Sequence, residues 1–193
     1  MAALQDFMIS RVRSKLLKTF LQKPEEMYYV RELTRLTGEE INAVRRELQR
    51  LVKKGLLKSE DRGNRVYYYF RKDYLFYTDL VNLVAKTTGL GGAIIKEQSK
   101  LGKIYFAMLS GKFVRHRPRK SDEVDLLIVG EVVLPQLAAL VRAEESKREK
   151  EINYTVMSKD EFEFRKRRND PFVSIIVASS KVMLIGDEDI LIN

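Results

Sequence analysis

The chain has 193 residues, 45% of them hydrophobic, which is typical of one ordinary domain or two small ones with packed cores. It contains no cysteine and a single histidine, His116, so disulfides, thiolate zinc sites and cysteine nucleophiles are excluded and a transition-metal site built from protein ligands alone is disfavoured. Because no apolar run approaches the length of a membrane span and no secretory leader is recognisable, we expect a soluble, cytoplasmic protein without a membrane partner.

The net charge of +9 is concentrated in the first part of the chain. Up to Asp73 the sequence holds 17 Lys and Arg and 10 Asp and Glu, a net of +7, whereas the remainder holds 19 and 17, a net of +2. A positive field confined to one domain attracts a polyanion and speeds its capture. Residues 1–73 are therefore the candidate nucleic-acid-binding domain.

This N-terminal domain is expected to begin with an amphipathic helix over residues 3–22, with Lys and Arg on the outside. The apolar residues that recur at helical spacing are Leu4, Phe7, Met8, Val12, Leu16, Leu17, Phe20 and Leu21. A helix of this kind supports either the core of the domain or a dimer interface.

A helix-turn-helix pattern follows the break at residues 23–24. Residues 30–36 predict a short helix, Thr37-Gly38 supplies a tight turn, and residues 39–54 predict a longer helix that ends before Gly55. The apolar stripe of the longer helix consists of Ile41, Val44, Leu48, Leu51 and Val52, which leaves Asn42, Arg45, Arg46, Gln49, Arg50 and Lys53 outside. These outer side chains are donors suited to bases and phosphates.

A basic β-hairpin completes the domain. Residues 56–60 and 65–70 are β-prone runs around the turn residues 61–64. The order helix, turn, helix, hairpin is that of a winged helix-turn-helix, in which the longer helix enters the major groove. Arg62 and Arg65 at the tip of the wing are then expected to contact phosphate or the minor groove.

The segment from Tyr28 to Phe70, YYVRELTRLTGEEINAVRRELQRLVKKGLLKSEDRGNRVYYYF, resembles the winged-helix regulators of the arsenical-repressor and multiple-antibiotic-resistance types. The resemblance implies a transcriptional regulator that binds double-stranded DNA, and a homodimer, since paired winged helices read two half-sites. Two other interpretations stay open: a merely solvated basic helix, and a winged helix that binds protein. Alternation sends Tyr67 and Tyr69 to one face and Tyr68 to the other, which favours packing over a base-stacking platform.

Residues 74–101 are predicted to be a helical connector. Helical spacing over residues 74–86 and 93–101 is interrupted at residues 87–92, whose three glycines predict a hinge between domains. A phosphate-binding loop is disfavoured because no strand precedes these glycines and no Lys-Ser or Lys-Thr pair follows them.

The C-terminal domain, residues 102–193, alternates short strands with helices. Such alternation predicts a mixed sheet covered by helices on at least one face. The expected strands are residues 104–109, 124–129 and 152–157, and the expected helices are residues 135–147 and 159–168. The fold class predicted for the whole chain is therefore a two-domain α+β or α/β protein.

The stretch from Gly111 to Gly130, GKFVRHRPRKSDEVDLLIVG, resembles the signature of minimal nucleotidyltransferases, in which a glycine-serine turn precedes two closely spaced aspartates. The resemblance extends over residues 73–189. It implies a turn that holds a triphosphate, and two carboxylates on one face of a strand that bind two divalent metal ions. In this sequence Glu123 and Asp125 occupy the two metal-binding positions.

Several positions depart from that signature. Gly111 matches the glycine, but Lys112 stands where the serine belongs, and the place of a third carboxylate falls at Asn153, a neutral and weaker metal ligand. Glutamate at position 123 moves the carboxylate by about 1.5 Å, one carbon–carbon bond, although in-line transfer requires close placement of both metals. We therefore expect Glu123 and Asp125 to be vestigial, with no metal site and no cofactor.

Two alternatives keep a ligand or a reaction in this domain. Gly111, Lys112 and Arg115 are candidates for a nucleotide or RNA site in which lysine replaces the charge of a metal, helped by Arg117, Arg119 and Lys120; a solvated basic loop is the simpler interpretation. The enzyme alternative is a nucleotidyltransferase that uses Mg²⁺ and a nucleotide to modify a protein or RNA, as in toxin-antitoxin pairs. Our main prediction is a DNA-binding regulator whose second domain is a scaffold, a dimerisation surface or a ligand sensor.

Overall fold

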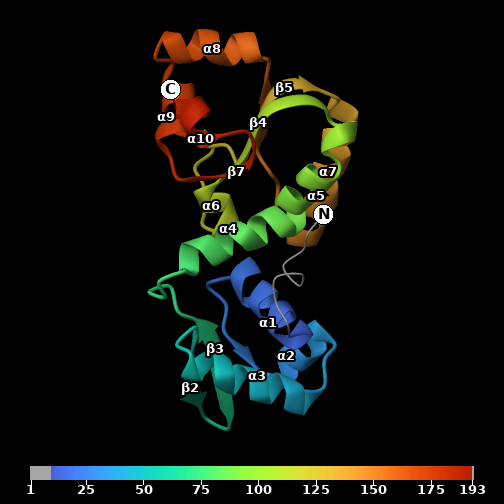
Figure 1. Cartoon of the computed structure of the whole chain (residues 1–193), viewed down its shortest axis with the longest axis vertical. Helices are drawn as coiled ribbons and strands as arrows, with labels where there is room; N and C mark the ends of the chain where they lie inside the picture. The colour runs from blue at the N-terminus through green and yellow to red at the C-terminus, as the bar shows by residue number, and fades with distance from the viewer. Residues whose placement is uncertain (1–9, 193) are drawn as a thin grey trace. The chain divides into compact units, whose positions relative to one another are not determined.

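The computed structural model describes residues 10–192 and is a mixed α and β protein with ten α-helices and two sheets in that range (Figure 1). The chain divides into two compact units at the boundary between Val84 and Ala85, which falls inside the predicted connector 74–101. Among the described residues no helix has the length and apolar character needed to cross a membrane.

The first unit combines three helices with a small antiparallel sheet in the strand order β1-β3-β2. The predicted helix-turn-helix and hairpin are confirmed as elements of secondary structure. Their bounds are α1 (Arg11–Gln22), β1 (Tyr28–Tyr29), α2 (Val30–Thr37), α3 (Ile41–Lys53), β2 (Leu57–Arg62) and β3 (Arg65–Phe70).

Helix α1 begins at Arg11, later than the sequence predicted. Ser10 has an extended backbone, and its hydroxyl accepts a hydrogen bond from the Arg13 N–H, which is the geometry of an N-cap. The expected apolar face is buried at Leu16, Leu17, Phe20 and Leu21. The remaining residues of the predicted stripe before Ser10, namely Leu4, Phe7 and Met8, lie outside the described residues.

The turn between α2 and α3 lies later in the chain and is one residue longer than the sequence predicted. Gly38 adopts the left-handed conformation, with φ +64°, and its N–H donates to the Thr34 carbonyl to close α2. Glu40 is then the N-cap of α3, because its carboxylate accepts hydrogen bonds from the Asn42 and Ala43 N–H groups. The helix predicted from residue 39 therefore starts at Ile41.

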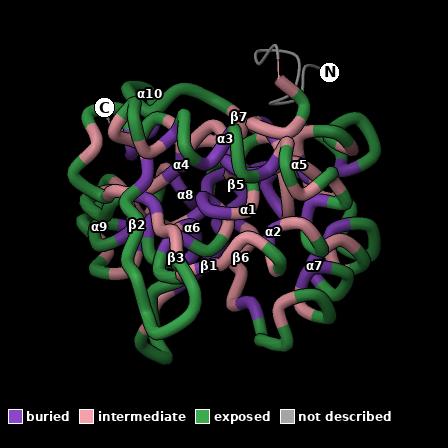
Figure 2. The backbone as a smooth tube through the Cα atoms, turned by 90° about the horizontal axis from the view of Figure 1, so that it is seen from below, coloured by how far each residue is buried: buried purple, intermediate pink, exposed green. Residues whose placement is uncertain are grey.

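The hairpin is also longer than expected. β2 extends to Arg62, which pairs with Arg65, so the loop consists only of Gly63 and Asn64. Gly63 has φ +60°, which a two-residue hairpin loop requires and which glycine adopts without a steric cost. β2 is exposed beyond its first residue, Leu57, which is buried, whereas β3 passes from the exposed Arg65 and Val66 through three half-buried tyrosines to the buried Phe70 (Figure 2).

The second unit contains a four-stranded sheet in the order β6-β5-β4-β7, in which only β5 and β6 are parallel. The boundary between the two units falls within helix α4. The elements from α4 onward are α4 (Tyr77–Thr87), α5 (Gly89–Lys96), the 3-10 turn η2 (Gln98–Lys100), β4 (Gly102–Ser110), α6 (Gly111–Val114), β5 (Leu126–Val132), α7 (Leu134–Arg148), β6 (Tyr154–Met157), α8 (Lys159–Arg167), α9 (Pro171–Ala178), β7 (Lys181–Ile185) and α10 (Glu188–Ile192).

Helices cover this sheet on both faces, as the apolar run of β5 requires. One core joins Phe106 and Leu127 of the sheet to Phe162 of α8 and Val173 of α9. Helices α5 and α7 pack together, and α5 contacts β7. The prediction of a mixed sheet with helices on at least one face is confirmed.

Two predictions for this region were wrong in detail. The predicted glycine hinge is partly helical, since Gly91 and Gly92 lie inside α5, and a Cβ on Gly91 would stand 2.2 Å from the Ala85 carbonyl oxygen. The strand predicted over 124–129 begins at Leu126, so Glu123 and Asp125 precede it instead of alternating along it. The alternation argument for a shared carboxylate face therefore does not apply.

Candidate functional site

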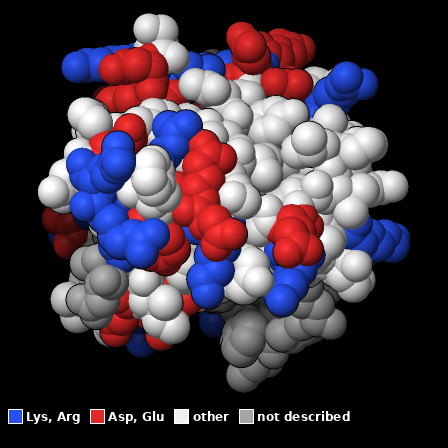
Figure 3. Space-filling model, turned by 90° about the horizontal axis from the view of Figure 1, so that it is seen from above, with Lys and Arg blue, Asp and Glu red and all other residues white. Residues whose placement is uncertain are grey.

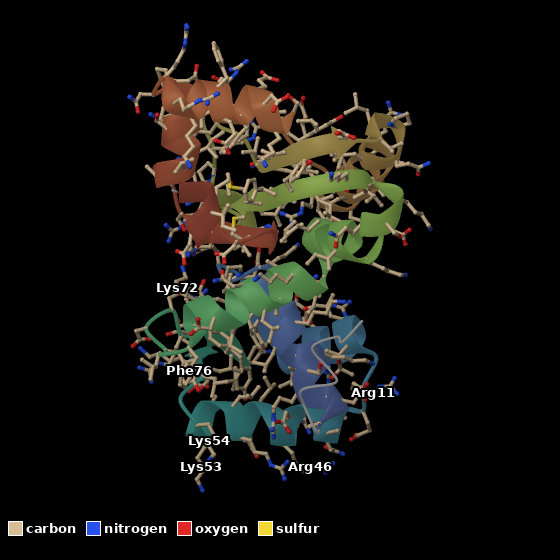
Figure 4. The ribbon with its side chains drawn as sticks, turned by 45° about the horizontal axis from the view of Figure 1, so that its top comes forward. Arg11, Arg46, Lys53, Lys54, Lys72 and Phe76 are labelled. Carbon is tan, nitrogen blue, oxygen red and sulfur yellow. The ribbon has the colours of Figure 1, made fainter. Side chains whose placement is uncertain are left out.

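The outer face of α3 carries the six side chains that the sequence singled out. All six are exposed: Asn42, Arg45, Arg46, Gln49, Arg50 and Lys53. Figure 4 shows Arg46 and Lys53 pointing away from the rest of the first unit. Within residues 10–192 no hydrogen bond or ion pair engages the side chains of Arg45, Arg46 or Lys53, whereas Arg50 lies 3.6 Å from Glu47. This face therefore offers cations and amides that are free to bind a partner.

A buried carboxylate, Glu47, fixes α3 against α1. The Glu47 side chain is only 4% exposed, and its Oε1 accepts a 2.5 Å hydrogen bond from the Arg13 Nε. Sequence analysis missed this pair. The signal was present, because Glu47 is three residues from Val44 and next to Leu48, which places it on the buried stripe.

A second set of ion pairs ties α1 to the turn before α3. The Lys15 Nζ donates to the Thr37 carbonyl at 2.7 Å and to the Glu39 carboxylate at 2.6 Å, and Arg11 lies 3.0 Å from Glu39. The hydrogen bond from Lys15 lowers the pKa of Glu39. α1 thus holds both the turn and the inner face of α3, which fixes the direction in which the outer face points.

The two arginines at the hairpin tip are exposed, and each contacts neighbouring side chains of the sheet. Arg62 donates to the Glu60 carboxylate at 2.9 Å and stands 5.7 Å from the centre of the Tyr67 ring. Arg65 lies over the Tyr29 ring at 4.7 Å. Both guanidinium groups therefore lie along one face of the sheet.

In the second unit, Lys112 forms an ion pair with the carboxylate of Glu123. The Lys112 Nζ donates to both carboxylate oxygens, at 2.5 and 2.7 Å, and the Lys120 N–H donates to one of them at 3.0 Å. These bonds, chiefly that from Lys112, lower the pKa of Glu123. Lys112, which was a candidate for binding phosphate, is thus paired within the chain.

Asp125 is buried and has its own internal cation. Its side chain is 6% exposed, and its Oδ2 accepts hydrogen bonds from the Arg119 Nε at 2.7 Å and the Asn153 N–H at 3.0 Å. The Asn153 amide also donates to the Glu123 carbonyl at 2.8 Å. The three positions taken from the nucleotidyltransferase resemblance do come together in space.

This donor set does not fit a pair of divalent metal ions. Lys112 already neutralises Glu123, and Arg119 already neutralises Asp125. The third position is the neutral Asn153. In the part of the chain that the structure describes, no group of three or more Asp, Glu, His or Cys side chains is arranged to hold a metal. We therefore derive no reaction step through a metal at this place.

The glycine turn is likewise filled by protein atoms. The Gly111 N–H donates to the Ser180 carbonyl at 2.7 Å, and Arg115 donates to the Ser180 hydroxyl at 3.1 Å. A Cβ on Gly111 would stand 2.4 Å from that hydroxyl. Ser110, which sequence analysis did not single out, caps α6 by accepting from the Phe113 N–H. Gly111 is required here for close packing against Ser180, which directly precedes β7.

Comparisons with protein-family models, curated proteins and solved structures found no match. Figure 3 shows a face on which Lys and Arg are interspersed with Asp and Glu, beside an area that carries neither. Acids and bases also pair within the second unit, as Arg165 and Glu161 do at 2.7 Å on α8. The uncommitted cations of α3 differ from this pattern.

Proposed function

We propose that the chain is a winged-helix transcriptional regulator that binds double-stranded DNA by inserting α3 into the major groove. The observation that carries the proposal is the outer face of α3, where Arg45, Arg46 and Lys53 are exposed and unpaired beside the amides Asn42 and Gln49. Arginine and asparagine or glutamine at such positions form bidentate bonds to guanine and adenine. Lysine contacts phosphate as a point charge.

The helix order of the first unit supports the same proposal. A short helix, a turn at Gly38 and a recognition helix are followed by a hairpin, and the ion pairs from α1 hold the recognition helix rigidly. A preorganised helix loses little entropy when it enters a groove. We propose that Arg62 and Arg65 contribute to phosphate binding next to α3, and that two copies of the chain read two half-sites as a homodimer.

For the second unit we propose a nucleotidyltransferase-like scaffold or ligand sensor that has lost its chemistry. Lys112 and Arg119 supply positive charge where the nucleotidyltransferases that this domain resembles hold metal ions. The proposal predicts no Mg²⁺-dependent incorporation of nucleotide into protein or RNA. Incorporation that is lost in Asp125→Asn would instead support the enzyme alternative.

The test of the DNA-binding proposal is fluorescence anisotropy with a labelled duplex from the region upstream of the gene. Arg46→Ala is expected to weaken binding by about 5- to 150-fold, the effect of losing one base-reading contact of 1 to 3 kcal/mol. Arg142→Ala is the matched control, because Arg142 is an exposed arginine on α7 of the second unit. Equal losses in the two variants would contradict a specific role of α3.

A further inference from the structure

The three strands of the first unit display their side chains on two different faces. In the register of the sheet, Tyr69 lies opposite Lys58, and Tyr67 lies opposite both Glu60 and Tyr29. Residues that are directly opposite, or two apart along a strand, share a face. One of the two faces is called here the outer sheet face. It consists of Tyr29, Lys58, Glu60, Arg62, Arg65, Tyr67 and Tyr69.

The other face is the one that packs into the core. Tyr28, Leu57 and Phe70 are buried there. Burial raises the pKa of Tyr28 to about 12. The outer sheet face does not share this burial, since Tyr29, Tyr67 and Tyr69 are each partly exposed. Packing in the core therefore accounts for Tyr28 and leaves the tyrosines of the outer sheet face without that explanation.

Aromatic rings and cations alternate on the outer sheet face. The rings of Tyr29 and Tyr67 meet edge to face, with centroids 5.7 Å apart. Arg65 covers the Tyr29 ring and Arg62 approaches the Tyr67 ring, while Arg35 of α2 donates to the Tyr29 hydroxyl at 3.5 Å. Flat rings and guanidinium planes are the groups on which nucleobases stack.

A groove of about 460 Å³ continues this surface past Tyr69. Tyr69, Met27 and Pro24 contribute apolar lining, and Lys58 lies on its wall. An ion pair between Lys72 and Glu25 also borders the groove. A volume of this size accepts a group as large as a nucleobase with its sugar. On the outer sheet face three cations, Lys58, Arg62 and Arg65, accompany one acid, Glu60, and Arg35 of α2 lies beside them. The groove itself carries equal numbers of both charges, with Lys58, Arg71 and Lys72 beside Glu25, Glu60 and Asp73.

We propose that the outer sheet face binds single-stranded nucleic acid, with bases stacked on Tyr67 and Tyr69 and phosphates held by Lys58 and the arginines. Arg62 and Arg65 are shared with the proposed duplex interface, whereas Tyr67 and Tyr69 are not, so replacing the two tyrosines separates single-strand binding from duplex binding by α3. Its occupant is identified by chemistry: a flexible polyanion with exposed planar bases satisfies the rings and the cations together.

The test measures binding of labelled dT12 and U12 by the full chain, by anisotropy and by quenching of tyrosine fluorescence. Tyrosine emission is not masked, because the chain has 9 tyrosines and no tryptophan. Tyr67→Ala with Tyr69→Ala is expected to weaken single-strand binding by about 5- to 150-fold for each base that loses its stacking partner. Tyr67→Phe with Tyr69→Phe keeps both rings and should bind within about twofold of the original chain.

Three outcomes decide the proposal, and a fourth tells whether the strand is RNA or DNA. Selective loss of single-strand binding in the alanine variant, with duplex affinity retained, supports it, and this retention also shows that the variant is folded. Stronger binding of U12 or of dT12 assigns the strand as RNA or DNA. No tyrosine quenching by either oligonucleotide in the unaltered chain overturns the proposal. Equal competition by polyglutamate also overturns it, because charge alone would then explain the surface, and neither result bears on duplex binding by α3.

Discussion

Replacing Arg13 with alanine is expected to destabilise the first unit, whereas replacing Arg11 with alanine should have little effect. Both arginines lie on α1, and each pairs with a glutamate of the helix-turn-helix. The two pairs differ in their exposure to water. The Arg13 and Glu47 side chains are 37% and 4% exposed, whereas Arg11 is 77% exposed.

The size of the effect follows from what remains after each change. Removing one partner of a fully buried ion pair costs about 3 to 5 kcal/mol, because the other charge stays buried. Arg13 is partly hydrated, and Arg50 at 3.6 Å stays near Glu47, so we expect about 2 kcal/mol for Arg13→Ala. Arg11→Ala leaves Glu39 paired with Lys15 at 2.6 Å, and exposed pairs contribute little.

Urea unfolding followed by tyrosine fluorescence measures this difference. The chain has no tryptophan, and seven of its 9 tyrosines lie before the boundary at Val84, so the signal reports mainly on the first unit. With a urea dependence of about 2 kcal/mol per molar, Arg13→Ala should lower the midpoint by about 1 M. In the background of Glu47→Gln, Arg13→Ala should lower the free energy of unfolding clearly less, because no buried carboxylate is then left unpaired.

The role assigned to Glu47 is refuted if Arg13→Ala and Arg11→Ala shift the midpoint equally. It is also refuted if Arg13→Ala costs as much in the Glu47→Gln background as in the unaltered chain. Either result would show that the buried carboxylate does not hold α1 against α3.

Three further predictions concern stability. Arg119→Ala leaves Asp125 buried and should destabilise the second unit by about 3 kcal/mol, whereas Lys112→Ala exposes a hydrated carboxylate and should cost little; circular dichroism melts compare them. Gly102→Ala should cost about 2 kcal/mol or more in the same melts, because φ is +95° and a Cβ would stand 2.2 Å from a carbonyl of β5. Backbone N–H groups lower the pKa of Glu40 below its ordinary 4.5, so its cap stabilises α3 above that pH and is lost as the pH falls through the lower folded value. Glu40→Gln should therefore lower the urea midpoint at pH 7 and leave it almost unchanged at pH 2.

Much of the local structure was predictable because hydrophobic spacing determines it. The alternation of Val44, Leu48 and Leu51 with polar residues placed α3 and its outer face correctly. The ends of elements were less predictable, since they depend on single capping residues. Helices α1 and α3 start later than predicted because Ser10 and Glu40 are their N-caps, whose side chains accept hydrogen bonds from backbone N–H groups.

The candidate sites were less predictable than the helices. The sequence predicted that Glu123, Asp125 and Asn153 lie together, but it could not indicate that Lys112 and Arg119 pair with the two carboxylates. Such pairs join residues in a loop and a short helix, where no periodicity applies. α9, β7 and α10 were also not predicted, because each is short and its burial depends on the rest of the sheet.

Anisotropy of the full chain with its own upstream duplex and with a random duplex, across a series of salt concentrations, tests whether α3 reads DNA. We expect tighter binding to the upstream duplex. The logarithm of the binding constant should fall with the logarithm of salt with a slope of about −3.6, if Arg50, Lys53, Arg62 and Arg65 each neutralise one phosphate. Arg46→Ala should reduce the preference for the upstream duplex, and Lys53→Ala should reduce the slope. Equal binding to both duplexes with an unchanged slope in Lys53→Ala, or no binding to either, would contradict the assignment of α3 as a DNA-reading helix.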